Sequence, residues 1–167
     1  KLRQEDNLVL SNGTGEKKFT IAATAKAFQI LSSALYSRKV EAIVRELSCN
    51  AYDSHVQAGC ADRPFAIYLP NEWESEFAVE DFGIGLDDDA VMNIYTSYFT
   101  STKTDSNEVI GGLGLGSKTP FASTDSFNIR ARKDGVERTY NAYISSSGEP
   151  SVSLLTEHAT TEPNGVK

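Results

Sequence analysis

Residues 111–119 read GGLGLGSKT, and two interpretations of this stretch predict two different folds. A P-loop consists of Gly, any four residues, Gly, Lys and then Ser or Thr. Gly111 and Gly116 have this spacing, but Ser117 stands at the lysine position and Lys118 comes one place late. The preceding residues 100–109, TSTKTDSNEV, are polar and do not form the hydrophobic strand that leads into a P-loop. We therefore consider a different phosphate-binding loop.

The glycine-rich stretch suits an anionic ligand even without the P-loop lysine. Four glycines in six residues allow backbone amide groups to converge on phosphate. A helix expected after the loop would add the positive end of its dipole, and Lys118 would add a mobile positive charge. A flexible linker would have no need for the leucines that alternate with the glycines. The loop residues in question are Gly111, Gly112, Leu113, Gly114, Leu115, Gly116, Ser117 and Lys118.

Composition limits the class of protein. The 167 residues suffice for one domain, and 23 acidic against 16 basic side chains give a net charge of -7. This balance argues against a broad face for nucleic acid or membrane lipid. No apolar run approaches the roughly 18 residues of a membrane span. Cys49 and Cys60 fit reduced intracellular thiols rather than a disulfide framework or metal site.

The order of predicted elements favours an α+β fold. Residues 1–18 form a polar N-terminal arm, and helices are expected over residues 24–35 and from a cap at Ser37 to Gly59. Strands are expected over residues 64–70 and 76–81, followed by a short helix near the aspartates at 87–89. A hairpin about Asp134 and Gly135 and a strand over 150–158 complete the chain. Blocks of this kind predict an antiparallel or mixed sheet and disfavour a doubly wound P-loop fold.

The long helix carries a line of polar residues. Glu46, Asn50 and Asp53 fall within about 60° of one another on its surface, and the apolar stripe of Val40, Ile43, Val44, Leu47 and Ala51 is centred about 110° away. Three such residues alone would also fit a solvated edge. Their chemistry matters because of a second motif, VEDFGIGL at residues 79–86, where Asp81 precedes Gly83 and Gly85. Asp81-Phe82-Gly83 is not a kinase motif, because no kinase catalytic loop precedes it.

In their order and spacing, these three motifs resemble those of the GHKL ATPase superfamily, which includes gyrase-type topoisomerase subunits, heat-shock chaperones, mismatch-repair ATPases and histidine kinases. Glu46 to Asp53 resembles the N-box, Asp81 to Gly85 the adenine-binding box, and Gly111 to Lys118 the glycine box of the ATP lid. The resemblance covers about residues 19–167. It implies a Bergerat-type α/β sandwich, with a mixed, mostly antiparallel sheet covered by helices on one face.

The resemblance also implies roles and ligands. The ligands are ATP and Mg²⁺. Glu46 would be the general base for the attacking water, Asn50 would hold Mg²⁺, and Asp81 would accept a hydrogen bond from the adenine amino group. Asp53, Gly83 and Gly85 would line the pocket, and the glycine loop would wrap the phosphates. Weaker candidates at the start of the lid are Ser101, Thr102 and Lys103.

Some features depart from the family pattern. A late Gly-Thr element is replaced by Gly165-Val166, and Thr161 is a candidate substitute. A carboxylate at Glu46 favours water activation over the phosphate transfer of histidine kinases, which usually carry asparagine there. For His55 and His158 we expect a surface or capping role.

Residues 17–59 resemble the start of phage rIIA-type lysis-inhibition accessory proteins. This implies a domain excised from a longer protein of the host-cell cytoplasm, with a host membrane or protein partner bound through other regions. The family pattern further implies an ATP-dependent homodimer and slow hydrolysis by the isolated domain. Two alternatives stay open: an interaction module on the same fold that does not use nucleotide, and a P-loop NTPase.

Overall fold

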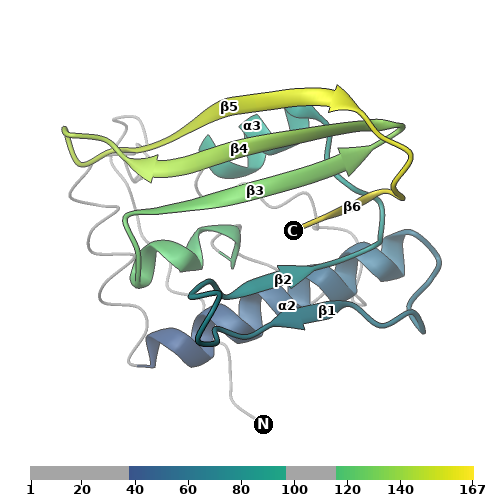
Figure 1. Cartoon of the computed structure of the whole chain (residues 1–167), viewed down its shortest axis with the longest axis horizontal. Coiled ribbons are helices and arrows are strands. Elements are labelled where there is room, and N and C mark those ends of the chain that lie inside the picture. The colour runs from purple at the N-terminus through teal and green to yellow at the C-terminus, as the bar shows by residue number, and fades with distance from the viewer. Residues whose placement is uncertain (1–37, 97–115) are drawn as a thin grey trace, which may run out of the picture.

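The computed structural model describes residues 38–96 and 116–167 (Figure 1). The N-terminal arm, the helix expected over 24–35 and most of the glycine loop lie outside these ranges. The described elements, in chain order, are helix α2 (Lys39–Gln57), strands β1 (Ala66–Tyr68) and β2 (Ala78–Glu80), helix α3 (Asp88–Thr96), the 3₁₀ helix η1 (Gly116–Ala122), and strands β3 (Ser126–Lys133), β4 (Val136–Ile144), β5 (Pro150–Ala159) and β6 (Gly165–Val166).

The strands form two sheets, and every pairing among the described strands is antiparallel. One sheet has the order β5-β4-β3-β6, and the other consists of β1 and β2. The Asp81 N–H, just after β2, donates to the Val166 carbonyl of β6 at 2.8 Å and connects the two sheets. Helices α2 and α3 lie behind the strands in the view of Figure 1. The α+β prediction is confirmed, and this antiparallel architecture is not that of a P-loop NTPase.

The hairpin predicted about Asp134 and Gly135 is present. Both residues have positive φ, 51° and 81°. They connect β3 to β4 between Lys133 and Val136, which form the last residue pair of the two strands. Positive φ at both positions is the conformation of a type I′ turn, which matches the right-handed twist of the flanking strands. This turn fixes the register that places Ile129 opposite Tyr140.

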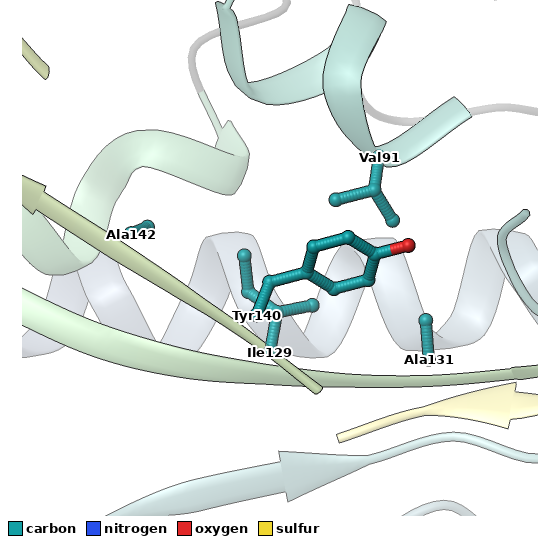
Figure 2. Packing of buried hydrophobic residues seen from close by; sticks show 5 residues of the cluster. All are labelled: Val91, Ile129, Ala131, Tyr140 and Ala142. Atoms are coloured by element: carbon teal, nitrogen blue, oxygen red, sulfur yellow. The ribbon is translucent and has the colours of Figure 1, made fainter. Parts of the chain in front are cut away.

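The hydrophobic core lies between the four-stranded sheet and α3. Val91, Ile129, Ala131, Tyr140 and Ala142 form one buried cluster, shown from close by in Figure 2. Tyr140 is fully buried, and its hydroxyl donates to Asp88 Oδ1 in the first turn of α3 at 2.9 Å. The buried phenol therefore has its hydrogen-bond partner while its ring packs against Val91. This contact fixes α3 on the sheet.

Helix α2 differs from its predicted packing. The stripe expected to be buried includes Val40, which is 70% exposed, whereas Asp53 and His55 are fully buried. The last turns of α2 bury polar side chains because the segment after β2 packs against them. The expected end of the helix is confirmed, since α2 stops at Gln57 and Gly59 has a φ of 71°. The expected cap, Ser37, lies outside the described residues.

Candidate functional site

Two of the predicted motifs meet at the start of η1. A Cβ atom built on Gly116 would lie 2.9 Å from Glu46 Oε2, 3.4 Å from Asn50 Nδ2 and 3.7 Å from Asn50 Oδ1. The last glycine of the loop therefore packs directly against the carboxylate and the amide on α2. A side chain at this position would push the Glu46 carboxylate aside, so glycine leaves that carboxylate in place.

Glu46 and Asn50 are partly accessible, and Asp53 is not. The Glu46 side chain is 23% exposed, and its Oε1 accepts a hydrogen bond from Arg45 Nη2 at 2.8 Å, which leaves Oε2 on the side of Gly116. Asn50 is half-buried. Asp53 has no exposed surface. Of the three polar residues predicted to share one side of the helix, Glu46 and Asn50 are therefore accessible to solvent and Asp53 is not.

Asp81 begins a tight turn after β2. It is 7% exposed, and its Oδ1 accepts from Ser54 Oγ and from the Gly83 N–H, both at 2.9 Å. Burial raises the pKa of the Asp81 carboxyl, and these two hydrogen bonds act in the opposite direction. Asp81 is therefore a desolvated carboxyl group held in one orientation by the helix and by its own turn.

His55 holds the same turn from α2. Its Nε2 accepts from the Phe82 N–H at 2.8 Å, and because an acceptor nitrogen carries no proton, Nδ1 is the donor to the Arg63 carbonyl, also at 2.8 Å. The surface position expected for His55 is wrong, because the ring is fully buried. Neither bond goes to a helix carbonyl, so His55 does not cap α2 either. It connects α2 to the segments on both sides of β1 and β2.

Glycines allow the turn to pack against backbone on two further sides. A Cβ on Gly83 would overlap Ser54, and one on Gly85, where φ is 65°, would overlap the Arg132 carbonyl of β3. A Cβ on Gly165 of β6 would overlap the Asp81 carbonyl. Gly165 and Val166 are thus the late-strand residues that contact Asp81, whereas Thr161 is exposed in the loop between β5 and β6.

The segment after the glycine loop differs from the prediction. It forms a seven-residue 3₁₀ helix that contains Pro120, so it does not supply the α-helical dipole that we expected there. Lys118 is 5% exposed, and its Nζ donates to the Ile94 carbonyl of α3 at 2.6 Å. Burial lowers the Lys118 pKa to about 8. The expectation of a mobile positive charge is wrong for this side chain.

The structure thus brings together the described parts of all three motifs. Ser117 is half-buried in η1. The other lid residues predicted to bind phosphate lie outside the described residues: Ser101, Thr102, Lys103, Gly111, Gly112, Leu113, Gly114 and Leu115. Sequence reasoning missed Ser54 and His55. Ser54 could have been found, because it lies four residues after Asn50 and so on the same side of the helix.

Two solved structures of the ATPase region of Saccharomyces cerevisiae topoisomerase II, one of them bound to dexrazoxane, are similar to this chain at a TM-score of 0.53. The similarity covers 74% and 75% of this chain at 15% sequence identity. The chain has the fold of a topoisomerase II ATPase region. It spans about a third of each topoisomerase chain, since 35% of that chain is covered.

This similarity of fold confirms the predicted Bergerat-type α/β architecture. No protein-family model and no curated protein matches the sequence. In residues 38–96 and 116–167, no helix has both the length and the apolar character needed to cross a membrane.

Proposed function

We propose that this chain binds Mg²⁺-ATP in the site formed by α2, the turn after β2 and η1, and that it hydrolyses the nucleotide slowly. The observation that supports this most directly is the contact of Gly116 with both Glu46 and Asn50. It joins a loop suited to phosphate with a carboxylate that could act as a base and an amide that could bind a metal. The topoisomerase II ATPase fold provides the independent support.

The residues around Gly116 fit a magnesium ion. Mg²⁺ prefers oxygen ligands and keeps several waters, so it often takes one or two protein ligands beside the phosphates of its substrate. Asn50 supplies a half-buried amide oxygen close to Gly116, and Glu46 Oε2 lies on the same side. Within the described residues, no group of three or more His, Cys, Asp or Glu side chains could hold a metal by itself. When bound, the metal would neutralise phosphate charge.

Each site residue has a proposed role. Glu46 orients a water molecule and takes its proton, and Asn50 holds the metal. Asp81 accepts a hydrogen bond from the adenine amino group, for which its desolvated carboxylate is suited. Asp53 lines the site near the nucleotide, and Gly83 and Gly85 shape the base pocket. The lid residues Ser101, Thr102, Lys103, Gly111, Gly112, Leu113, Gly114, Leu115 and Ser117 enclose the phosphates. Lys118 contributes its backbone there, because its ammonium group is buried against Ile94. Thr161 stays a candidate near the end of the chain.

We further propose a biological setting, which rests on the resemblance of residues 17–59 to phage rIIA-type proteins. In this setting the chain is the N-terminal ATPase domain of a longer protein in the host-cell cytoplasm. Closure of the lid over ATP would act as a conformational switch and would favour a homodimer. Membrane or protein partners would bind through other regions. The alternative is an interaction module that keeps the fold without using nucleotide.

Calorimetric titration with Mg²⁺ and a non-hydrolysable ATP analogue tests the proposed site. We expect binding that depends on the metal and falls at least about tenfold in Asp81→Asn, because the amide has one neutral acceptor oxygen where the carboxylate has two charged ones, and its NH2 group can only donate. Asp125→Asn makes the same chemical change at an exposed position just before β3 and should bind like the wild type.

The opposite results distinguish the alternatives. Binding that is indifferent to Asp81 would contradict the assignment of the adenine pocket. A chain that binds no nucleotide in the presence of Mg²⁺ would favour the interaction module.

A further inference from the structure

Ser54 forms hydrogen bonds with both ends of the turn between Asp81 and Ile84. Its Oγ lies 2.9 Å from Asp81 Oδ1 and 3.2 Å from the backbone nitrogen of Ile84. The Ile84 N–H can only donate, so the Ser54 hydroxyl accepts at that contact and its single proton points to Asp81. The direction of the Ser54–Asp81 hydrogen bond is thereby fixed, with Asp81 as the acceptor.

The two donors to Asp81 reach the same carboxylate oxygen. Oδ1 accepts from Ser54 Oγ and from the Gly83 N–H, and the Val166 backbone also favours the charged form of the carboxyl group. An ionised carboxylate is an acceptor only, whereas a protonated carboxyl group also donates. Burial favours the neutral form of Asp81, and the hydrogen bonds from Gly83 and Ser54 favour the charged form. Ser54 therefore helps to keep Asp81 ionised, and an ionised carboxylate can accept a hydrogen bond from a ligand but cannot donate one.

We propose that Ser54 is a specificity-determining residue of the base pocket, because it keeps Asp81 an acceptor and so selects a 6-amino purine over a 6-oxo purine. The inference rests on the proposed function. A 6-amino group donates to a carboxylate oxygen, whereas a 6-oxo group is itself an acceptor and would be repelled. Without the Ser54 hydroxyl, Asp81 would be protonated more readily, and its own O–H could then donate to a 6-oxo group.

The neighbouring contacts leave the rest of the turn in place when this hydroxyl is removed. His55 Nε2 still accepts from the Phe82 N–H, and the Asp81 N–H still donates to Val166. Ser54→Ala removes one atom and creates no overlap with Gly83, which packs against Ser54. The substitution therefore changes the chemistry of Asp81 more than it changes the path of the backbone.

The test is calorimetric titration of the full chain with ADP and with IDP in the presence of Mg²⁺. We expect the wild type to bind ADP more tightly, and Ser54→Ala to reduce the ratio of the two affinities by about tenfold, the effect of one hydrogen bond to a charged acceptor. Ser54→Thr keeps the hydroxyl and should keep most of the preference. Ser48→Ala makes the same change on another side of α2 and should bind like the wild type.

A purely structural role for Ser54 would weaken ADP and IDP by the same factor, and that result would overturn the inference. An unchanged ratio in Ser54→Ala would also overturn it. Both results are compatible with the proposed function as long as Asp81→Asn still weakens binding of the ATP analogue. A wild-type chain that binds no nucleotide would overturn both proposals.

Discussion

At the scale of single residues, burial changes what a side chain can contribute. Lys118 would be a solvated cation in most loops, but here its ammonium group is almost completely enclosed and donates to the Ile94 carbonyl. The lowered pKa of Lys118, about 8, follows from this burial. Part of the folding free energy therefore depends on pH.

We predict that Lys118 makes the protein more stable as the pH rises from about 8 to 10. In this range the unfolded lysine, with a pKa of about 10.4, binds more protons than the folded one, so the free energy of unfolding increases with pH. Lys118→Met should lack this increase, which amounts to at most about 3 kcal/mol. Urea unfolding at several pH values would measure it.

The control for this prediction is Lys39→Met, at the exposed first residue of α2. This variant should keep the pH dependence of the wild type. The stability of Lys118→Met could instead rise with pH as much as that of the wild type. That result would contradict the assignment of the effect to Lys118.

At the scale of elements, one buried ion pair joins the two sheets. Glu80 at the end of β2 accepts from Arg132 Nη2 of β3 at 2.5 Å and from the Tyr68 hydroxyl of β1 at 2.7 Å. Burial opposes ionisation of Glu80, but the hydrogen bonds from Tyr68 and Arg132 prevail and hold its pKa below the usual range. Glu80 is the residue before Asp81, so this pair also fixes the start of the candidate base pocket.

Glu80→Gln should destabilise the fold by about 3–5 kcal/mol, because it leaves a buried guanidinium without its counter-charge. The folded pKa of Glu80 is depressed, so its contribution is present above the unfolded pKa and is lost as the pH falls through the folded value. The difference between variant and wild type should therefore shrink in acid, as measured by urea unfolding.

Glu137→Gln is a suitable comparison, because its partner Arg130 has a side chain that is 51% exposed and lies 3.7 Å away. This change should cost less than about 1 kcal/mol. Equal effects of the two substitutions would contradict the view that the β2–β3 pair is the stronger connection.

The elements also show which features of a sequence can be predicted. The β3–β4 hairpin depends on two residues with left-handed conformations, and Asp134-Gly135 is a strong local signal for it. The line of Glu46, Asn50 and Asp53 depends only on helical spacing. The face of α2 that is buried could not be predicted, because it is set by contacts of Ser54 and His55 with a turn 27 or more residues later. The enclosure of Lys118 depends on α3 in the same way.

At the scale of the whole molecule, the proposed site combines residues that no single element contains. Glu46 and Asn50 come from α2, Gly116 from η1 and Asp81 from the end of β2, and the core around Tyr140 fixes α3 to the sheet beside them. The resemblance to a known family predicted this combination, whereas residue spacing alone left a P-loop and a solvated helix edge open. The antiparallel sheets and the similarity in fold to topoisomerase II ATPase regions exclude the P-loop fold.

We predict that Glu46→Gln separates binding from turnover. The amide cannot take a proton from water, so ATP hydrolysis by the chain should fall by a factor of about 10² or more, while affinity for the non-hydrolysable analogue stays within about threefold. Phosphate release under multiple turnover would measure the rate, and calorimetry the affinity. Glu41→Gln, near the exposed start of α2, is the matched control. Hydrolysis that persists in Glu46→Gln would assign the base to another residue.

The glycine contacts around Asp81 have a consequence for the history of this domain. At Gly83, Gly85 and Gly165 a single added methyl group would collide with neighbouring backbone or with Ser54, whereas Gly59 has open space around its Cβ position. A substitution at any of these three glycines must therefore be accompanied by movement of a strand or a helix. In such a domain, a few close backbone contacts would be kept while most of the sequence changes. This is compatible with a similar fold at 15% sequence identity.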